Sequence, residues 1–194
     1  MTREERPEAA KLGWKLQRSD TRFENKVLRL REDQLEVPKK GQTAFAYAVK
    51  GAAVIIVPVT ADGQMVLLRQ FRYPVDEWCL EVPAGTTRDT GDTPLEEVAA
   101  KELKEEIGAT FERLEKVGSF FSNSSLSDEE CHVFLALGTT LSEKPKPEPM
   151  ESIEILLTPL AEAVAMVRQG RMKTGPSALA VLLSDEKLRA HGII

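Results

Sequence analysis

Three carboxylates stand close together in the segment Lys101–Gly108, at Glu102, Glu105 and Glu106. On a helix, Glu102 and Glu106 lie one turn apart, so their charges repel unless a cation lies between them. A set of carboxylate oxygens suits a hard divalent ion, Mg2+ or Mn2+, better than zinc. The alternative is an ordinary solvated helix face, on which glutamates are common.

The segment that positions these carboxylates is predicted to be a helix from about Pro94 to Ile107, because proline suits the first turn and the following glycine suits the end. At about 100° per residue, the apolar side chains form one core-facing stripe. Glu102 and Glu106 project within this stripe, and Glu105 lies at its border. Since ionised carboxylates on an apolar face carry a large desolvation cost, the pattern favours a bound metal over a solvated face. The stripe consists of Leu95, Val98, Ala99, Leu103 and Ile107.

The composition indicates one substantial globular domain. The chain has 194 residues, of which 42% are hydrophobic and 29% charged, and its formal net charge is -5. It contains no apolar run of membrane-spanning length, so a membrane association is not expected. The acidic balance makes nucleic-acid binding unlikely, because such proteins usually carry a basic stripe.

Residues 1–14 lack the apolar core of a secretory signal and are expected to form a solvated lead-in. The chain has two cysteines, Cys79 and Cys131, both in hydrophobic segments. We interpret both as core residues without a disulfide, which favours a reducing cytoplasmic location.

The remaining segments predict a mixed sheet with helices packed on its faces, an α+β fold. Residues 1–50 are interpreted as an N-terminal extension containing two strands within Lys26–Gly51, and residues 51–194 as the main domain. Further strands are predicted at 52–59, 65–72, 77–82, 114–121, 131–137 and 153–157, and helices at 160–169 and 175–183.

The stretch Gly85–Ala109 resembles the Nudix box, G-x5-E-x7-R-E-U-x-E-E-x-G-U, where U is a bulky aliphatic residue. Its second half fits as KELKEEIGA, with Lys101 in place of arginine. Its first half departs from the pattern, because Gly85 lies two residues too far from Glu102 and the first glutamate is replaced by Asp92 or Thr93, depending on where the gap is placed.

The resemblance extends to most of the chain. Arg69–Pro74, Leu80–Gly85 and Ser127–Leu135 are similar to segments of the ADP-ribose pyrophosphatase and nucleoside-diphosphate-sugar hydrolase branch of the Nudix hydrolases. This resemblance implies a Nudix-type α/β/α sandwich around a mixed sheet and a homodimer that uses the N-terminal strands. The sequence departs from the ADP-ribose subgroup at Asn123–Ser125, where Ser-Pro-Gly is usual.

The activity implied by the resemblance is metal-dependent hydrolysis of the pyrophosphate bond in ADP-ribose or a nucleoside diphosphate sugar, which yields a nucleoside monophosphate and a sugar phosphate. The implied metal ligands are the Ala84 carbonyl, Glu102, Glu105 and Glu106, with Mg2+ as the ion and Mn2+ as an alternative. Glu105 and Glu106 are also implied as catalytic residues. The implied general base is Glu151, which follows the proline-rich segment 144–149.

The candidate substrate-binding residues are Arg69, Arg72 and Glu81. Arg69 and Arg72 are three residues apart on one predicted strand, so they point to opposite faces and at most one contacts phosphate. We favour Arg72, with an exposed ion pair as the alternative. Glu81 either orients a ligand or forms a structural salt bridge.

Two other functions fit the same residues. A Nudix-fold module could bind a nucleotide without cleaving it, and the irregular first half of the box leaves this alternative open. A hydrolase of dinucleoside polyphosphates would use the same carboxylates. Retention of Glu102, Glu105 and Glu106 favours an enzyme.

Overall fold

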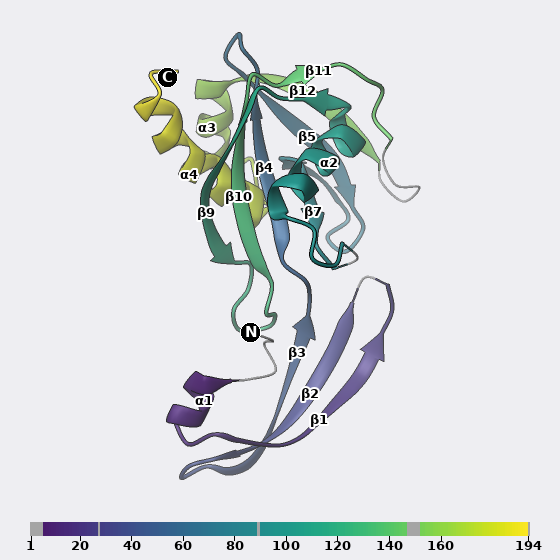
Figure 1. Cartoon of the computed structure of the whole chain (residues 1–194), viewed down its shortest axis with the longest axis vertical. Helices are drawn as coiled ribbons and strands as arrows, with labels where there is room; N and C mark the ends of the chain where they lie inside the picture. The colour runs from purple at the N-terminus through teal and green to yellow at the C-terminus, as the bar shows by residue number, and fades with distance from the viewer. Residues whose placement is uncertain (1–5, 27, 89, 147–151, 194) are drawn as a thin grey trace. The chain divides into compact units, whose positions relative to one another are not determined.

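The computed structural model describes residues 6–26, 28–88, 90–146 and 152–193 (Figure 1). Its internal contacts divide the chain into two compact units. One unit combines the N-terminal residues up to Lys50 with the segment Asn123–Glu129, and the other combines Gly51–Ser122 with the chain from Glu130 to the C-terminus.

The first unit is built on a three-stranded antiparallel sheet. A short helix, α1 (Pro7–Lys11), precedes strands β1 (Lys15–Glu24), β2 (Arg29–Val37) and β3 (Gly41–Val49), which lie in the order β1-β2-β3. The lead-in is solvated as expected, since α1 buries no residue, but Pro7–Lys11 is helical, and β1 was not predicted. Most side chains of β1 are exposed, so its sequence lacks the alternating apolar residues that indicate a strand.

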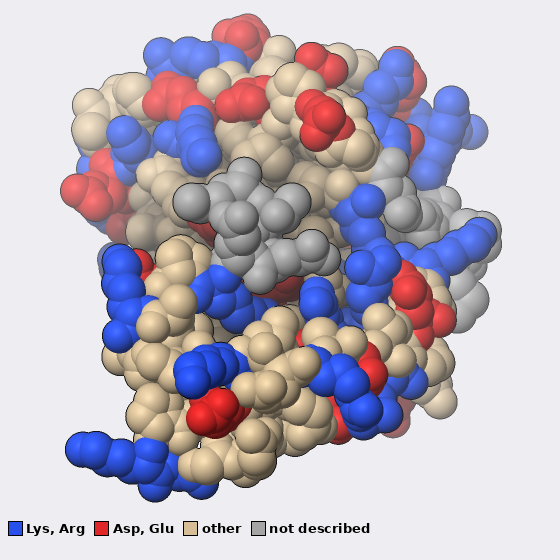
Figure 2. Space-filling model, turned by 60° about the horizontal axis from the view of Figure 1, so that its bottom comes forward, with Lys and Arg blue, Asp and Glu red and all other residues tan. Residues whose placement is uncertain are grey.

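Charged side chains of both signs are spread over the surface of the protein (Figure 2). On the face shown in Figure 2, lysines and arginines are interspersed with aspartates and glutamates. In the first unit these residues form close ion pairs, such as Arg29 Nη2 with Glu24 Oε1 at 2.6 Å. Both side chains of that pair are more than two-fifths exposed, so solvent screening limits its contribution to stability.

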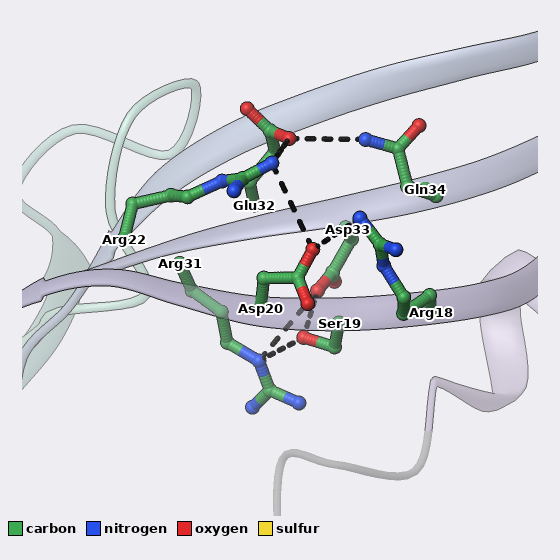
Figure 3. Close-up of polar contacts among 8 residues, drawn as sticks. All are labelled: Arg18, Ser19, Asp20, Arg22, Arg31, Glu32, Asp33 and Gln34. Carbon is green, nitrogen blue, oxygen red and sulfur yellow. Dashed lines mark hydrogen bonds and ion pairs between the residues drawn. The ribbon is translucent and has the colours of Figure 1, made fainter.

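A polar network joins β1 to β2 (Figure 3). Asp33 on β2 is only 3% exposed; it accepts a hydrogen bond from the Ser19 hydroxyl of β1 and pairs with Arg31 Nε at 3.5 Å. Asp20 of β1 pairs with Arg18 Nη2 at 2.8 Å. The buried Asp33 therefore has the partners that a buried carboxylate requires.

The Arg22–Glu32 pair belongs to the same network (Figure 3) and crosses from β1 to β2. The Arg22 guanidinium donates a hydrogen bond to the Glu32 carboxylate, which lowers the pKa of Glu32. Few apolar side chains are buried in this unit, so backbone pairing and polar contacts fix the register of β1.

The second unit contains a mixed sheet in the order β12-β5-β4-β10-β9, with β6 paired to β5 and β7 paired to β4. Strands β4 and β10 are parallel and the other pairs are antiparallel, so the prediction of a mixed sheet is confirmed. The bounds of these strands are β4 Ala53–Val59, β5 Gln64–Arg72, β6 Glu77–Glu81, β7 Ala84–Thr86, β9 Arg113–Phe121, β10 Glu130–Leu137 and β12 Ile153–Pro159. A separate pair joins β8 (Ala109–Thr110) to β11 (Thr140–Leu141).

The mixed sheet is covered on both faces. Helix α2 (Leu95–Ile107) lies on one face, and helices α3 (Leu160–Arg168) and α4 (Gly175–Ala190) lie on the other (Figure 1). Successive residues of β4 alternate between the two cores, with Val54 and Ile56 on the α2 side and the odd-numbered residues on the other. Burial on both faces explains the uninterrupted apolar sequence of β4.

The segment before the predicted metal-binding helix lies where β4 and β5 separate. These two strands pair directly at Val59 and Met65. Further along, β5 pairs with β6 and β4 pairs with β7, so the β6–β7 segment fills the space between them. The backbone N–H of Ile56 also donates to the Pro83 carbonyl at 2.8 Å. The sheet thereby holds Ala84 and Gly85 in a fixed position.

Cys79 and Cys131 are both buried and form no disulfide, as predicted. Among the residues that the structure describes, no helix is long and apolar enough to cross a membrane.

Helix α2 ends at Gly108, where the chain adopts a left-handed conformation with φ of 62°. A Cβ at this position would lie 2.0 Å from the carbonyl oxygen of Glu143, which is backbone and cannot rotate away. The N–H groups of Ser142 and Glu143 both donate to the Gly108 carbonyl at 2.9 Å. The glycine thus permits a second segment to dock on the end of the helix.

We expect Gly108→Ala to lower the free energy of unfolding by about 2 kcal/mol, or roughly 4–8 °C in Tm. Gly170→Ala is the matched control, because Gly170 also has a positive φ, 70°, but no atom of the described residues lies within 4 Å of the position that its Cβ would occupy. Gly170→Ala should lower the free energy of unfolding by only about 1 kcal/mol, which is the cost of the left-handed conformation for alanine. Equal losses in thermal denaturation would contradict the docking argument.

Candidate active site

Helix α2 presents its carboxylates as the sequence predicts. Its apolar stripe packs on the sheet, with Val98, Ala99, Leu103 and Ile107 buried. Glu106 lies within this face and is only 7% exposed, whereas Glu102 and Glu105 are half-buried. The helical period predicted both Glu102 and Glu106 on this face; the structure buries Glu106 and leaves Glu102 half-buried.

Two of the carboxylates meet the backbone of β7. Glu106 Oε2 accepts a hydrogen bond from the Ala84 N–H at 3.0 Å. The Glu102 carboxylate lies against Gly85, where a Cβ would fall 2.1 Å from Glu102 Cδ and 2.2 Å from Oε1. Because Gly85 has no side chain, it leaves space for the Glu102 carboxylate, and we call this space the Gly85 cradle.

Glu105 occupies a more exposed position. Its Oε2 lies 3.5 Å from Lys101 Nζ, and both side chains are about half exposed. Lys101 therefore stands beside Glu105, one turn away on the same helix. The backbone carbonyl of Glu105 accepts a hydrogen bond from the Lys146 N–H at 2.7 Å, which attaches Lys146 to α2.

The donor set of this region consists of carboxylate oxygens beside the half-buried backbone of Ala84 and Gly85. Within the described ranges, no group of three or more acidic, histidine or cysteine side chains is gathered in metal-binding geometry. The two carboxylates that converge on Ala84 and Gly85 nevertheless supply hard oxygen donors, and the Gly85 cradle leaves room for one of them. These features suit Mg2+ or Mn2+.

Arg72 and Glu81 form a bidentate pair on the same side of the sheet as α2. Leu68, which belongs to the core cluster that contains the buried residues of α2, is directly opposite Glu81 in the β5–β6 register, and Arg72 is four residues further along β5. Arg72 Nε donates to Glu81 Oε1 at 3.0 Å and Nη2 donates to Oε2 at 2.5 Å. Glu81 is 3% exposed, whereas the Arg72 side chain is 44% exposed.

Arg69 lies on the opposite face, as its spacing from Arg72 predicts. Its register partner, Leu80, packs against the core beneath α3 and α4. Arg69 Nη1 donates to Glu154 Oε2 at 2.8 Å, and its guanidinium lies 4.7 Å from the centre of the Trp78 ring. The structure thus separates Arg69 from the carboxylates of α2.

The irregular first half of the box forms the turn before α2. Asp92 and Thr93 are both exposed there, and the Thr93 hydroxyl donates to the Thr90 carbonyl at 2.6 Å. This turn supplies the additional residues between Gly85 and Glu102. Glu151, the candidate base, lies outside the described residues.

Sequence reasoning missed one polar residue of this region, Thr174. Its hydroxyl donates to Glu81 Oε1 at 3.0 Å, although the two residues are 93 positions apart in the chain. The available sequence signal, a threonine before Gly-Pro, indicates only the start of a helix. Its contact with β6 depends on how α4 docks.

Comparisons with known proteins agree with this geometry. Residues 49–178 match the family described as NUDIX domain. The chain is 31% identical over 172 residues to an ADP-ribose pyrophosphatase of Bacillus subtilis (strain 168), covering 87% of this chain and 92% of that protein. It is 29% identical to a methanol dehydrogenase activator of Bacillus methanolicus, covering 82% and 85%.

Among solved structures, the chain is similar to one described as an ADP compounds hydrolase. The TM-score is 0.80 over 93% of this chain and 97% of that one, at 19% sequence identity. At this identity the likeness concerns the fold, and it agrees with the mixed sheet covered by helices described above.

Proposed function

Because this chain belongs to the Nudix hydrolase family, we propose that it is a metal-dependent hydrolase of ADP-ribose or a related nucleoside diphosphate sugar. The products are a nucleoside monophosphate and a sugar phosphate. The observation that carries the proposal is the convergence of Glu102 and Glu106 on the Ala84–Gly85 backbone. The similarity to the Bacillus subtilis ADP-ribose pyrophosphatase supports this choice of substrate.

In this proposal, Glu102 and Glu106 hold the metal together with the Ala84 carbonyl, and Glu105 binds a further ion. When bound, divalent ions screen the charge of the two phosphates and activate the attacking water. The protein itself orients the ligands: the Ala84 N–H holds the Glu106 carboxylate, and Gly85 leaves space for that of Glu102. Mg2+ is the proposed ion, and Mn2+ fits the same oxygen donors.

The central experiment is incubation of the protein with ADP-ribose, sugar nucleotides and dinucleoside polyphosphates in the presence of Mg2+. We expect release of AMP from ADP-ribose and no release in the presence of EDTA. Preferential cleavage of the dinucleoside polyphosphates would favour that alternative substrate. Binding without cleavage of any compound would instead identify a nucleotide-binding module.

We assign the phosphate contact to Arg72, which shares a sheet face with α2 and is held by Glu81. Arg72→Lys should raise KM about tenfold, because lysine lacks the two parallel N–H groups that bind a carboxylate or phosphate. Arg69→Lys, the matched change on the other face, should change KM by less than about threefold. A larger rise in KM for Arg69→Lys than for Arg72→Lys in steady-state kinetics would assign the phosphate contact to Arg69 instead.

Glu151 is proposed as the general base, because it lies after the Nudix box at a place comparable to that of the base in similar enzymes. The chain on one side of it is fixed to α2 through Lys146, and on the other side Ser152 accepts a hydrogen bond from the Phe71 N–H at 3.2 Å. Comparison of kcat for Glu151→Gln and Glu154→Gln tests the proposal. Equal values would exclude Glu151 as the base.

We further propose that the protein is a cytoplasmic homodimer whose N-terminal strands, within residues 1–50, form the interface. Exposed apolar side chains of the first unit support this interface, and they include Leu12, Trp14, Leu16, Phe23 and Phe45. The two free cysteines suit a reducing compartment. A monomeric mass in light scattering at micromolar concentration would rule out the dimer.

A further inference from the structure

The first turn of α4 is attached to β6 by two hydroxyl side chains. Thr174 Oγ1 donates to Glu81 Oε1 at 3.0 Å. Ser177 Oγ, which is 3% exposed, accepts a hydrogen bond from the Val82 N–H at 3.3 Å. The adjoining Lys173 Nζ also pairs with Glu77 of β6 at 2.6 Å, so the contact follows the length of the strand.

Thr174 is the N-cap residue of α4, yet its side chain does not cap the helix. Threonine is favoured at this position because its oxygen usually accepts a hydrogen bond from an N–H in the first turn. Here no such bond is formed, although the Thr174 carbonyl accepts the ordinary helical bond from the Ala178 N–H at 2.9 Å. The hydroxyl is committed to Glu81 instead.

Glu81 is the residue through which this contact reaches the candidate site. Its carboxylate is almost fully buried, so its orientation depends on the donors around it. Oε1 accepts one hydrogen bond from Thr174 and one from Arg72 Nε at 3.0 Å, and Oε2 accepts one from Arg72 Nη2 and a longer one from Arg72 Nε at 3.2 Å. The hydrogen bond from Thr174 restrains Oε1, and so restrains the orientation of the carboxylate and of the guanidinium paired with it.

We propose that Thr174 is a positioning residue for substrate. It orients the Glu81 carboxylate and, through it, the Arg72 guanidinium that binds the phosphate. This inference rests on the proposed function, since it assigns Thr174 a role in the same site. A threonine that served only the start of α4 would direct its hydroxyl to its own helix, and this one does not.

The test uses Thr174→Val, which keeps the shape of the side chain and removes the hydroxyl, and Thr174→Ser, which restores the hydroxyl. For ADP-ribose with Mg2+, Thr174→Val should raise KM about fivefold and leave kcat within about twofold, because a ground-state contact is loosened. Thr174→Ser should return KM to within about twofold of the wild-type value.

The matched control is Thr139→Val. Thr139 is 2% exposed and donates its hydroxyl to the Ala136 carbonyl at 2.9 Å, so the change removes a buried hydroxyl bond from the same unit. Thr139 N–H donates to the Val59 carbonyl, at the end of β4 opposite to the end that pairs with β7. This control should lower Tm and leave KM unchanged.

A second readout does not require turnover. Solvent exchange of the Arg72 Nε–H, followed by NMR and assigned with Arg72→Lys, should be about fivefold faster in Thr174→Val, since weaker hydrogen bonding gives less protection. If wild-type protein cleaves none of the candidate substrates, the proposed function fails, but this measurement still decides the link from Thr174 to Arg72.

The inference is overturned if Thr174→Val lowers Tm while KM and Arg72 exchange stay at wild-type values, because its role is then structural. It is also overturned if Thr174→Ser fails to restore KM. Should Thr174→Val not fold, Thr174→Ala supplies the same comparison without a branched apolar side chain, and the same criteria apply.

Discussion

Glu106→Gln is expected to lower kcat/KM by about 10³-fold, because loss of a carboxylate ligand forfeits several kcal/mol of metal-assisted stabilisation. The substitution suits the site, since the amide oxygen of glutamine can still accept the hydrogen bond that the Ala84 N–H donates at 3.0 Å. The fold should therefore persist with a Tm near that of the wild type. Steady-state kinetics over a range of Mg2+ concentrations measures the effect.

The control for this prediction is Glu97→Gln on the same helix. Glu97 lies in the first turn of α2 and is exposed, so its neutralisation removes a charge of the same kind without touching β7. We expect its kcat/KM to remain near the wild-type value. A loss in Glu106→Gln no larger than that in Glu97→Gln would remove Glu106 from the proposed metal site.

Gly85→Ala is expected to lower kcat/KM by about 10²-fold while leaving Tm nearly unchanged, because displacement of a catalytic group by about 1 Å has an effect of this size. The added Cβ would overlap Glu102 Cδ, Oε1 and Cγ, which it would meet at 2.1, 2.2 and 2.3 Å. These atoms belong to a side chain and not to backbone, so the whole Glu102 side chain must turn away while the backbone can stay in place. The backbone of Gly85 has no positive φ, so alanine brings no backbone strain.

Gly118→Ala provides the comparison for Gly85→Ala. Gly118 lies in β9, has no positive φ, and has no atom of the described chain within 4 Å of the position of an added Cβ. Its kinetics and Tm should match the wild type. If Gly85→Ala also keeps full activity, the cradle for Glu102 has no functional role. A large fall in Tm would instead show that the backbone had moved.

Helix α2 was predictable because its signals are local. Leu103 and Ile107 are four residues apart and lie on the buried face of the helix. Glu106, three residues after Leu103, lies on the same face. The expected bounds differ from the observed helix only at Pro94, which is its N-cap. The buried strands β4 and β10 were likewise evident as apolar runs, since both faces of the sheet are covered.

Other elements could not be recognised from local patterns. Strand β1 is mostly exposed and charged, and it is held by pairing with β2 rather than by an apolar stripe. Helix α4 continues to Ala190 beyond its predicted end, and it buries the polar residues Ser184 and Asp185. Asp185 pairs with Arg189 one turn further along α4, as helical spacing allows, but its other partner, Arg168, lies on α3 and is brought there only by helix packing.

The sequence by itself placed Glu102 and Glu106 on the core-facing side of α2, because a helix repeats every 3.6 residues whatever surrounds it, and the tertiary structure decided that Glu106 is the more deeply buried. It also determined that Arg69 and Arg72 lie on opposite faces, because a strand alternates. Only the tertiary structure decided what these groups meet: the Ala84 N–H for Glu106, the bare backbone of Gly85 for Glu102, and Glu81 with Thr174 for Arg72. Those contacts join distant segments, and their geometry follows from how α2 and α4 pack against the sheet.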